Sequence, residues 1–187
     1  MSKISITGGS ARGRVITHSG NDFVRPTTSM TRQGIFSILD SREIRGAFLD
    51  LFSGSGIMAC EAISRGFDSA VCVEASRQQC FMIKSNLELL NMVKQVIVLP
   101  MKVEKALNRL KSLDIRFSVV YMDPPYKTGI PGDFIFQIFE SGILSRDGVL
   151  MLEKSIKTEP PHVPDGSVVL SKCHKWGETE VCIYEAG

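Results

Sequence analysis

The stretch LDLFSGSGIMA, from Leu49 to Ala59, decides the fold because a strand pattern passes through a glycine turn into a helix pattern. The run AFLDLF (47–52) is typical of a short buried strand, and GSGIMACEAISRG (54–66) is typical of a turn that leads into a helix. Glycines let the backbone approach a ligand closely, and a helix N-terminus offers free N–H groups. The stretch therefore predicts the first strand–turn–helix unit of an α/β fold.

The same alternation continues to the end of the chain. Short apolar runs predict further strands at 69–74, 95–99, 117–123 and 148–153, and amphipathic segments predict helices at 76–90, 102–113 and 133–142. The last two apolar runs, SVVL (167–170) and EVCIYE (180–185), predict a closing hairpin. Strands that alternate with helices favour a mostly parallel sheet covered on both faces.

The segment before this unit predicts a small extension. KISIT and RVITH flank the turn GGSARG, so residues 3–18 are expected to form a β-hairpin. RPTTSMTRQGIFSILD then offers Thr and Ser N-caps ahead of a helix whose buried face includes Ile35 and Phe36. We expect residues 1–24 to form the extension and residues 25–187 the main domain.

Composition limits the class of protein. The chain has 187 residues, 43% of them hydrophobic and 22% charged, which fits one soluble domain. No apolar run approaches the length of a membrane span, and the N-terminus lacks a signal-peptide pattern, so we expect a cytoplasmic protein. Residues 1–45 have a net charge of +4 and the remainder −2. This asymmetry favours a polyanion contact, although a solvated surface would look the same.

Five cysteines, at positions 60, 72, 80, 173 and 182, show no C-x-x-C spacing, and the three histidines are scattered. We expect buried, reduced thiols and no metal site.

Several polar residues fall where predicted strands end. Asp50 to Gly56, Glu74, the segment after Leu99, and Asp123 to Tyr126 all occupy such positions. Because ligands bind beyond the carboxyl ends of the strands in open α/β sheets, these segments should converge on one edge.

The glycine turn and Glu74 together predict a nucleoside ligand. Glu74 follows Gly56 by 18 residues, where a carboxylate accepts hydrogen bonds from both ribose hydroxyls. GSGIMA also satisfies the dinucleotide fingerprint G-x-G-x-x-A, so a dehydrogenase is the main rival, and a purely structural turn is the plainest alternative. Asp50 precedes the glycines, and a carboxylate there repels a pyrophosphate but suits a cationic sulfur or amino group.

The segment Asp123-Pro124-Pro125-Tyr126 predicts a pocket for an amino-bearing base. Two prolines fix the backbone and remove two N–H donors, which leaves carbonyls and a carboxylate as a rigid set of acceptors. Both hydrogens of an exocyclic amino group would bind these acceptors, and Tyr126 would stack on the base. The base would first have to be unstacked, and catalysis would come from positioning and electrostatics. The alternative is a tight loop in which Tyr126 only packs.

Several quoted stretches resemble one family. The chain resembles the bacterial RsmD family, the 16S rRNA guanine-N2 methyltransferases. The stretches that carry the resemblance are ITGGSARGRVI, RPTTSMTRQGIFSIL, FLDLFSGSGIMACEAISRG, YMDPPY, the pair EK after the fifth strand of the predicted sheet, and KWGETEVCIY. The resemblance covers essentially the whole chain. It implies a Rossmann-like class I methyltransferase with a seven-stranded, mostly parallel sheet and an antiparallel last strand. It also implies S-adenosylmethionine as cofactor and the assembled small ribosomal subunit as substrate, and we expect a monomer.

The resemblance also implies residue roles. The methionine and adenosine site would include Asp50, Phe52, Gly54 and Gly56, with Glu74 on the ribose. The guanine amino group would lie against Asp123, Pro124, Pro125 and Tyr126. The segment Arg25–Thr28 would close over the site, with Thr28 near the cofactor, and Arg12, Arg14 and Arg25 would contact rRNA.

One position departs from the family pattern. Lys102 stands where an Asp or Asn usually contacts the adenine, so backbone N–H groups around Lys102 and Val103 are the candidate contacts. Three other functions stay open. A DNA adenine-N6 or cytosine-N4 methyltransferase would need a target-recognition domain that 187 residues do not obviously hold. A nicotinamide dehydrogenase would need a catalytic His or Tyr/Lys pair, and a non-catalytic RNA-binding protein would have a decayed site.

Overall fold

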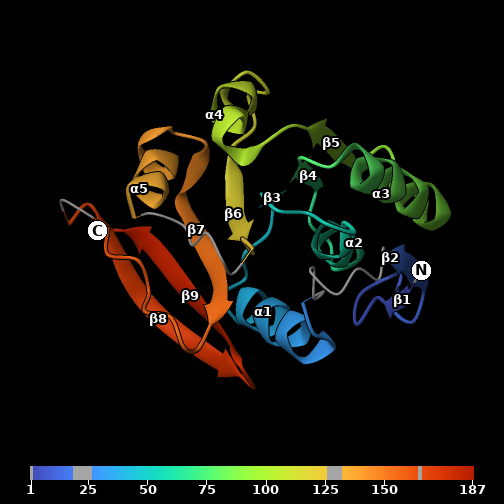
Figure 1. Ribbon diagram of the computed structural model, residues 1–187, viewed down its shortest axis with the longest axis horizontal. Coiled ribbons are helices and arrows are strands. Elements are labelled where there is room, and N and C mark those ends of the chain that lie inside the picture. The colour runs from blue at the N-terminus through green and yellow to red at the C-terminus, as the bar shows by residue number, and fades with distance from the viewer. Residues whose placement is uncertain (1, 19–26, 126–131, 164–165) are drawn as a thin grey trace.

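The protein is described here by a computed structural model that covers residues 2–18, 27–125, 132–163 and 166–187 (Figure 1). Its central sheet has seven strands in the order β5-β4-β3-β6-β7-β9-β8. All neighbouring strands are parallel except β9, which is antiparallel to both β7 and β8. The strands are β3 (Ala47–Asp50), β4 (Ser69–Glu74), β5 (Val96–Pro100), β6 (Phe117–Met122), β7 (Leu144–Ser155), β8 (Val168–Trp176) and β9 (Thr179–Ala186). The predicted fold class, a mostly parallel seven-stranded sheet with an antiparallel last strand, is confirmed.

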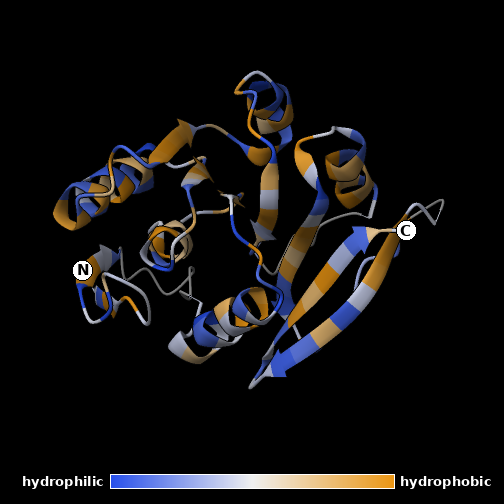
Figure 2. Cartoon of the chain, turned by 180° about the vertical axis from the view of Figure 1, so that it is seen from behind, coloured by the Kyte–Doolittle hydropathy of each residue, from blue (hydrophilic) through white to orange (hydrophobic). Residues whose placement is uncertain are grey.

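Helices cover both faces of this sheet and bury two separate apolar clusters (Figures 1 and 2). One cluster lies under α1, α2 and α3, and the other lies under α4 and α5. The helices are α1 (Ser29–Ser41), α2 (Ile57–Ser64), α3 (Arg77–Leu90), α4 (Val103–Lys111) and α5 (Gly132–Glu140). Side chains alternate along a strand, so successive residues of β6 contribute to opposite clusters. No helix in these described ranges is long and apolar enough to cross a membrane.

The N-terminal hairpin forms as predicted and joins the first of these clusters. Strands β1 (Ser2–Ser5) and β2 (Val15–His18) pair antiparallel, and Ile6, Ala11 and Ile16 are buried with the side chains of α1, α2 and α3. The hairpin therefore shares its apolar core with the helices of the main fold.

Two strands are longer than the sequence pattern indicates. β7 begins at Leu144, four residues early, and its pairing with β6 shifts register beside Gly148, where an added Cβ would lie 2.9 Å from the carbonyl oxygen of Phe117. The polar segment KCHKW continues β8 to Trp176, because each of its residues still pairs with β9. β8 is an edge strand, and polar residues on an edge strand hide it from a hydrophobicity pattern.

The prediction of five reduced thiols is only partly right. Cys60, Cys72 and Cys80 are free and buried, and burial raises the pKa of the Cys60 thiol to about 12. Cys173 and Cys182 instead form a disulfide. They occupy opposite positions on β8 and β9 with their Cα atoms 4.1 Å apart. Hairpin register, which the spacing alone does not reveal, brings them together.

Candidate active site

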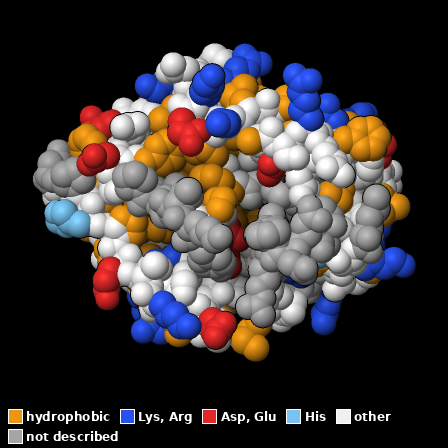
Figure 3. Space-filling model, in the orientation of Figure 1, with side chains coloured by type: hydrophobic (Ala, Val, Ile, Leu, Met, Phe, Trp, Pro, Cys, Tyr) orange, Lys and Arg blue, Asp and Glu red, His pale blue; other side chains and the backbone are white. Residues whose placement is uncertain are grey.

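Four polar side chains gather at the carboxyl edge of the sheet, on the face covered by α1. Asp50 pairs with Tyr121 in the β3–β6 register, and Tyr121 pairs with Met151 in the β6–β7 register. Because side chains repeat every second residue, Asp123 and Glu153 project to the same face, one step further along their strands. Figure 3 shows acidic side chains near the middle of the face of the molecule in view. The predicted convergence of strand ends is therefore present for β3 and β6, and the end of β7, which was not among the predicted segments, joins them.

The glycine turn brings β3 and β4 together at the same edge. Gly54 and Gly56 have φ angles of +50° and +76°, in the left-handed region that favours glycine. An added Cβ at Gly56 would also lie 3.0 Å from Ile83 of α3. Sequence and structure thus agree that this turn requires glycine.

The Glu74 carboxylate is held by this turn. The Gly54 N–H donates to Oε2 at 2.9 Å, and the Ser76 N–H donates to Oε1 at 2.8 Å. Each carboxylate oxygen can accept more than one hydrogen bond, so Glu74 keeps acceptor capacity for ligand hydroxyls. The backbone fixes its direction before any ligand binds.

Asp50 is a buried acid without a well-formed hydrogen bond. Its side chain is 1% exposed, and neither carboxylate oxygen has a partner of good geometry within the described residues. Burial raises the pKa of Asp50 to about 7, the charge of Glu74 adds to this effect, and the nearby Phe52 N–H and Ser53 hydroxyl offset only part of it. A buried carboxylate left unpaired is costly, so the site favours a ligand that brings a positive charge or N–H donors to Asp50.

A chain of hydrogen bonds links Thr27, Tyr121 and Glu153. The Tyr121 hydroxyl donates to Glu153 Oε2 at 2.5 Å, and the Thr27 hydroxyl lies 3.1 Å from the Tyr121 hydroxyl. Burial, followed by the charge of Glu153, raises the pKa of Tyr121 well above its ordinary value. The phenol therefore stays protonated and bridges the other two side chains.

Asp123 lies beside this chain as a second acid with a raised pKa. Burial is the largest cause, and the charges of Glu153 and Asp50 raise its pKa further. Burial likewise raises the pKa of Glu153. Three carboxyl groups thus share a poorly solvated space, and burial raises the proton affinity of each.

Arg32 fastens the start of α1 over this space. Its guanidinium is 1% exposed, donates to the carbonyl of Thr27 at 2.6 Å and to the carbonyl of Ser5 at 2.9 Å, and its Nε lies 3.3 Å from Glu61 Oε1. Glu61 also accepts from the N–H of Thr7 at 2.7 Å. One buried ion pair therefore ties the hairpin, α1 and α2 together behind the site.

The remaining predicted cofactor residues differ in burial and lie on different elements. Lys102 is exposed and Val103 buried at the N-terminus of α4, where the first N–H groups lack intrahelical partners. Phe52 is half-buried and packs against the cluster under α4 and α5. Thr28 caps α1, its hydroxyl oxygen accepting from the N–H of Thr31 at 3.2 Å.

Of the predicted base pocket, Pro124 is buried and Pro125 exposed, directly after Asp123. Tyr126 and Arg25 lie outside the described residues.

The two hairpin arginines differ. Arg14 donates to the carbonyl oxygens of Leu89 and, at 3.3 Å, Leu90 at the end of α3, so its guanidinium caps that helix. Arg12 is exposed, and its side chain forms no hydrogen bond or ion pair within the described part of the chain.

Sequence reasoning assigned no role to Tyr121, Glu153 and Arg32. Glu153 carried the same signal as Asp123, an acid at the end of an apolar strand, so the strand-end rule would have found it. Tyr121 lies inside the run FSVVYMD and resembles any core aromatic.

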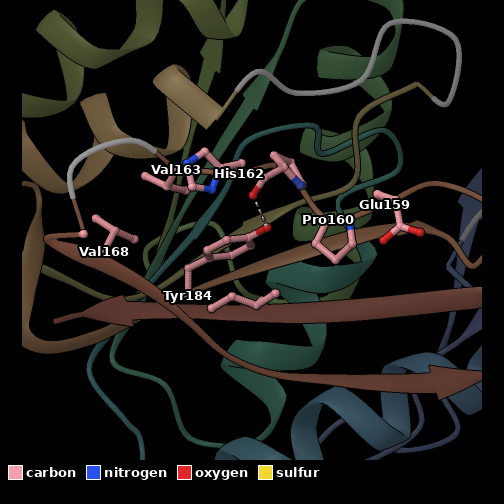
Figure 4. A pocket seen from close by; sticks show the side chains of 9 residues that line it. Glu159, Pro160, His162, Val163, Val168 and Tyr184 are labelled. Carbon is pink, nitrogen blue, oxygen red and sulfur yellow. Dashed lines mark hydrogen bonds between the residues drawn. The ribbon is translucent and has the colours of Figure 1, made fainter.

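A pocket elsewhere contains none of the predicted residues. It is lined by Glu159, His162 and Val168, and Tyr184 donates from its hydroxyl to the carbonyl of Pro161 at 3.1 Å (Figure 4). Tyr184 belongs to the cluster under α4 and α5, so this pocket lies on the face of the sheet opposite Glu153.

Comparisons with known proteins agree with this geometry. The family model described as "Conserved hypothetical protein 95" matches residues 4–185. The chain is 31% identical over 180 residues to YlbH of Bacillus subtilis, provisionally named an rRNA methyltransferase, covering 96% of this chain and 97% of that protein. It is 28% identical to ribosomal RNA small subunit methyltransferase D of Escherichia coli, covering 87% of this chain and 80% of that one.

A solved structure of a hypothetical protein from Thermus thermophilus is similar throughout, with a TM-score of 0.84, 28% identity and coverage of 98% and 99% of the two chains. The family model spans almost all of the sequence, and the matched relatives are aligned over most of their own lengths. The resemblance found in the sequence motifs is confirmed, and the chain belongs to the Conserved hypothetical protein 95 family, the RsmD family.

Proposed function

We propose that the protein transfers a methyl group from S-adenosylmethionine to the exocyclic N2 of a guanine in 16S rRNA of the small ribosomal subunit. One observation carries the proposal: Asp50 is buried, poorly partnered and electrostatically coupled both to Glu74 and to Asp123. The nucleoside half and the amino-acceptor half of the site therefore meet at one carboxylate. The named relatives supply the substrate class, since one of them is a small-subunit rRNA methyltransferase.

The residues present fit this cofactor. Glu74 offers acceptors for ribose hydroxyls beside the glycine turn, and Asp50 offers a negative charge to a cationic sulfur or amino group. The N–H groups at Lys102 and Val103 are the candidate adenine contacts, and Phe52 and Thr28 complete the proposed set. When bound, S-adenosylmethionine supplies an electrophilic methyl group on a sulfonium.

The acceptor half would orient the amino group and take its proton. Asp123 and the Pro124 carbonyl would accept both amino hydrogens, which directs the nitrogen lone pair toward the methyl group. As the new N–C bond forms and the S–C bond breaks, the nitrogen loses one proton. The raised pKa of Asp123 makes its carboxylate a better proton acceptor than an exposed one. The Thr27 hydroxyl, itself held by Tyr121, would orient that carboxyl.

The remaining roles belong to the same proposal. Residues 1–24 would form an RNA-contacting extension through Arg12, and Arg25 and Tyr126 would contact RNA and the target base. We propose a cytoplasmic monomer that acts on the assembled subunit without a metal.

The deciding experiment measures transfer from labelled S-adenosylmethionine to small subunits, naked 16S rRNA and duplex DNA, with nucleoside digestion of the products. N2-methylguanosine formed on the small subunit supports the proposal. Label on adenine N6 or cytosine N4 of DNA would move the protein to the DNA enzymes. Cofactor binding without transfer to any substrate would indicate a binding-only protein.

A further inference from the structure

The outward face of α3 carries an aromatic ring that the fold does not use. Phe81 is 74% exposed, more than any other large apolar side chain in the described ranges. The same helix buries Cys80, Ile83 and Leu87 against the sheet, so its core-facing side is complete without Phe81. A ring left in water forgoes the stabilisation that burial would give, so it is available to a partner outside the fold.

Two cations share this face with the ring. Arg77 precedes Phe81 by four residues and Lys84 follows it by three, which places all three side chains on neighbouring turns of one helix face. Both cations are exposed. Neither forms an ion pair with a described carboxylate, including Glu88, which lies four residues beyond Lys84. An aromatic ring between unpaired cations is the chemistry that binds a nucleic-acid strand.

The same helix is joined to the N-terminal hairpin. The Thr17 N–H donates to Asn86 Oδ1 at 3.0 Å, and Asn86 Nδ2 donates to the Thr17 carbonyl at 2.8 Å. Arg14 caps the end of α3 from the hairpin side. Figures 1 and 2 show α3 beside β1 and β2 from two opposite directions. The hairpin that carries the exposed Arg12 therefore packs directly against α3.

We infer that the face formed by Arg77, Phe81 and Lys84 binds an unpaired nucleotide of the substrate RNA. Phe81 stacks on the base, and the two cations contact the flanking phosphates. This inference rests on the proposed function for its RNA, and it adds a second RNA contact away from the target base. The flanking charges favour RNA over an apolar protein surface, which becomes an outcome of the test.

The first test separates a stacking ring from a merely apolar one. Phe81→Ala, Phe81→Leu and Phe81→Trp are compared by equilibrium binding to small ribosomal subunits prepared from cells that lack this protein. Loss of one stacked base weakens binding about 5- to 150-fold. We expect Phe81→Ala and Phe81→Leu to show this loss and Phe81→Trp to retain wild-type binding. Val169→Ala, at the far edge strand β8, is the matched apolar control.

Several results would overturn the inference. Equal binding by Phe81→Ala and the wild type would show that the ring is unused. Rescue by Leu as complete as rescue by Trp would indicate an apolar protein contact in place of a base. A changed S-adenosylmethionine dissociation constant in Phe81→Ala would place the ring in the cofactor site. In turnover, a raised KM with unchanged kcat supports the inference, and a lowered kcat alone contradicts it.

The second test addresses the cations. Arg77→Ala combined with Lys84→Ala should reduce the slope of log affinity against log salt by about 1.4, the value for two contacts to single-stranded phosphates. Lys105→Ala combined with Lys111→Ala removes the same charge from α4, on the other face of the sheet, and should leave the slope near wild type. Equal slopes for the two double variants would contradict the inference.

Binding and transfer are measured separately, so the two proposals fail in different ways. A wild-type protein that methylates no rRNA refutes the proposed function, and its RNA affinity still reports on Phe81. A wild-type protein that methylates the subunit, together with unchanged binding in every α3 variant, refutes only the α3 contact.

Discussion

The two halves of the candidate site hold their acids in different ways. In the nucleoside half, two backbone N–H groups fix Glu74 at 2.9 and 2.8 Å, both from turns next to its own strand end. In the amino-acceptor half, side-chain hydroxyls connect Thr27, Tyr121 and Glu153, which come from segments far apart in the chain. The first half is therefore built locally, and the second exists only when the whole fold is formed.

Asp50 belongs to both halves and is satisfied by neither. No described group donates to it with good geometry, while the charge of Glu74 raises its pKa and its own charge raises the pKa of Asp123. The unliganded site therefore holds electrostatic repulsion where the cofactor would bring positive charge. Variants in each half should then affect different measurements, cofactor affinity for one and turnover for the other.

The largest expected effect is the loss of turnover in Asp123→Ala, a variant of the amino-acceptor half. Asp123→Ala removes an acceptor aimed at the amino group, so kcat should fall by about 10²–10³ or more, with S-adenosylmethionine affinity changed only slightly. Single-turnover transfer and calorimetry measure the two quantities. Asp133→Ala, an acid at the start of α5, is the control. Turnover within a few-fold of wild type would remove Asp123 from the chemistry.

The converse variant lies in the nucleoside half. Glu74→Ala should weaken S-adenosylmethionine binding by roughly 10- to 100-fold, because two charge-assisted hydrogen bonds to the ribose are lost. At saturating cofactor, kcat should stay close to wild type. Glu74→Gln keeps one acceptor and should show a smaller loss. An unchanged dissociation constant for Glu74→Ala would show that Glu74 does not bind the cofactor.

Asp50→Asn should remove the pH dependence of S-adenosylmethionine affinity and lower that affinity at high pH. The pKa of Asp50 is raised to about 7, so the wild-type acid becomes charged only as pH rises through that value. S-adenosylmethionine affinity should therefore rise about 10-fold from about pH 6 to about pH 8 in the wild type and stay flat in the variant. Measurement of the S-adenosylmethionine dissociation constant across this pH range tests the prediction. Equal pH dependence in the wild type and the variant would show that Asp50 does not contact the cofactor.

Asp50→Asn should also change the stability of the unliganded fold, and here the charge of Asp50 is unfavourable. An acid whose folded pKa exceeds its ordinary value of 3.8 destabilises the unliganded fold progressively as pH rises from about 4 to about 7, and the full cost remains above that. Asp50→Asn should therefore raise the melting temperature at about pH 8 and leave it unchanged near pH 4. A variant less stable than wild type at the higher pH would mean that Asp50 has a strong partner.

Local signals predicted that Glu74 lies beside the glycine turn, and the Gly54–Glu74 hydrogen bond shows that placement. Gly54, Gly56 and Glu74 are close in sequence, and a glycine turn followed by a strand-end acid allows few geometries. The seven strands followed from the same alternation, except that β7 begins four residues early and KCHKW extends an edge strand.

The acceptor half was harder because its parts are brought together by register and by α1. Tyr121 is an ordinary core aromatic until β7 places Glu153 beside it. Thr27 contacts the Tyr121 hydroxyl from the segment whose carbonyl Arg32 binds. The disulfide between Cys173 and Cys182 has the same origin, since pairing across a hairpin is a property of register.

The smallest expected effect tests the hairpin, where two arginines with the same sequence signal have different surroundings. Arg12→Ala should weaken binding to the small subunit a few-fold and reduce the salt slope by about 0.7–0.9, one phosphate contact, without changing stability. Arg14→Ala should instead lower the free energy of unfolding by about 0.5–1.5 kcal/mol, because it removes donors to the last carbonyls of α3. Salt-dependent binding and denaturant unfolding of both variants separate the roles. If Arg14→Ala alone changed the salt slope of RNA binding, the α3 cap would be incidental and Arg14 would be the RNA contact. If neither variant changed that slope, the positive charge of residues 1–45 would be a solvated surface.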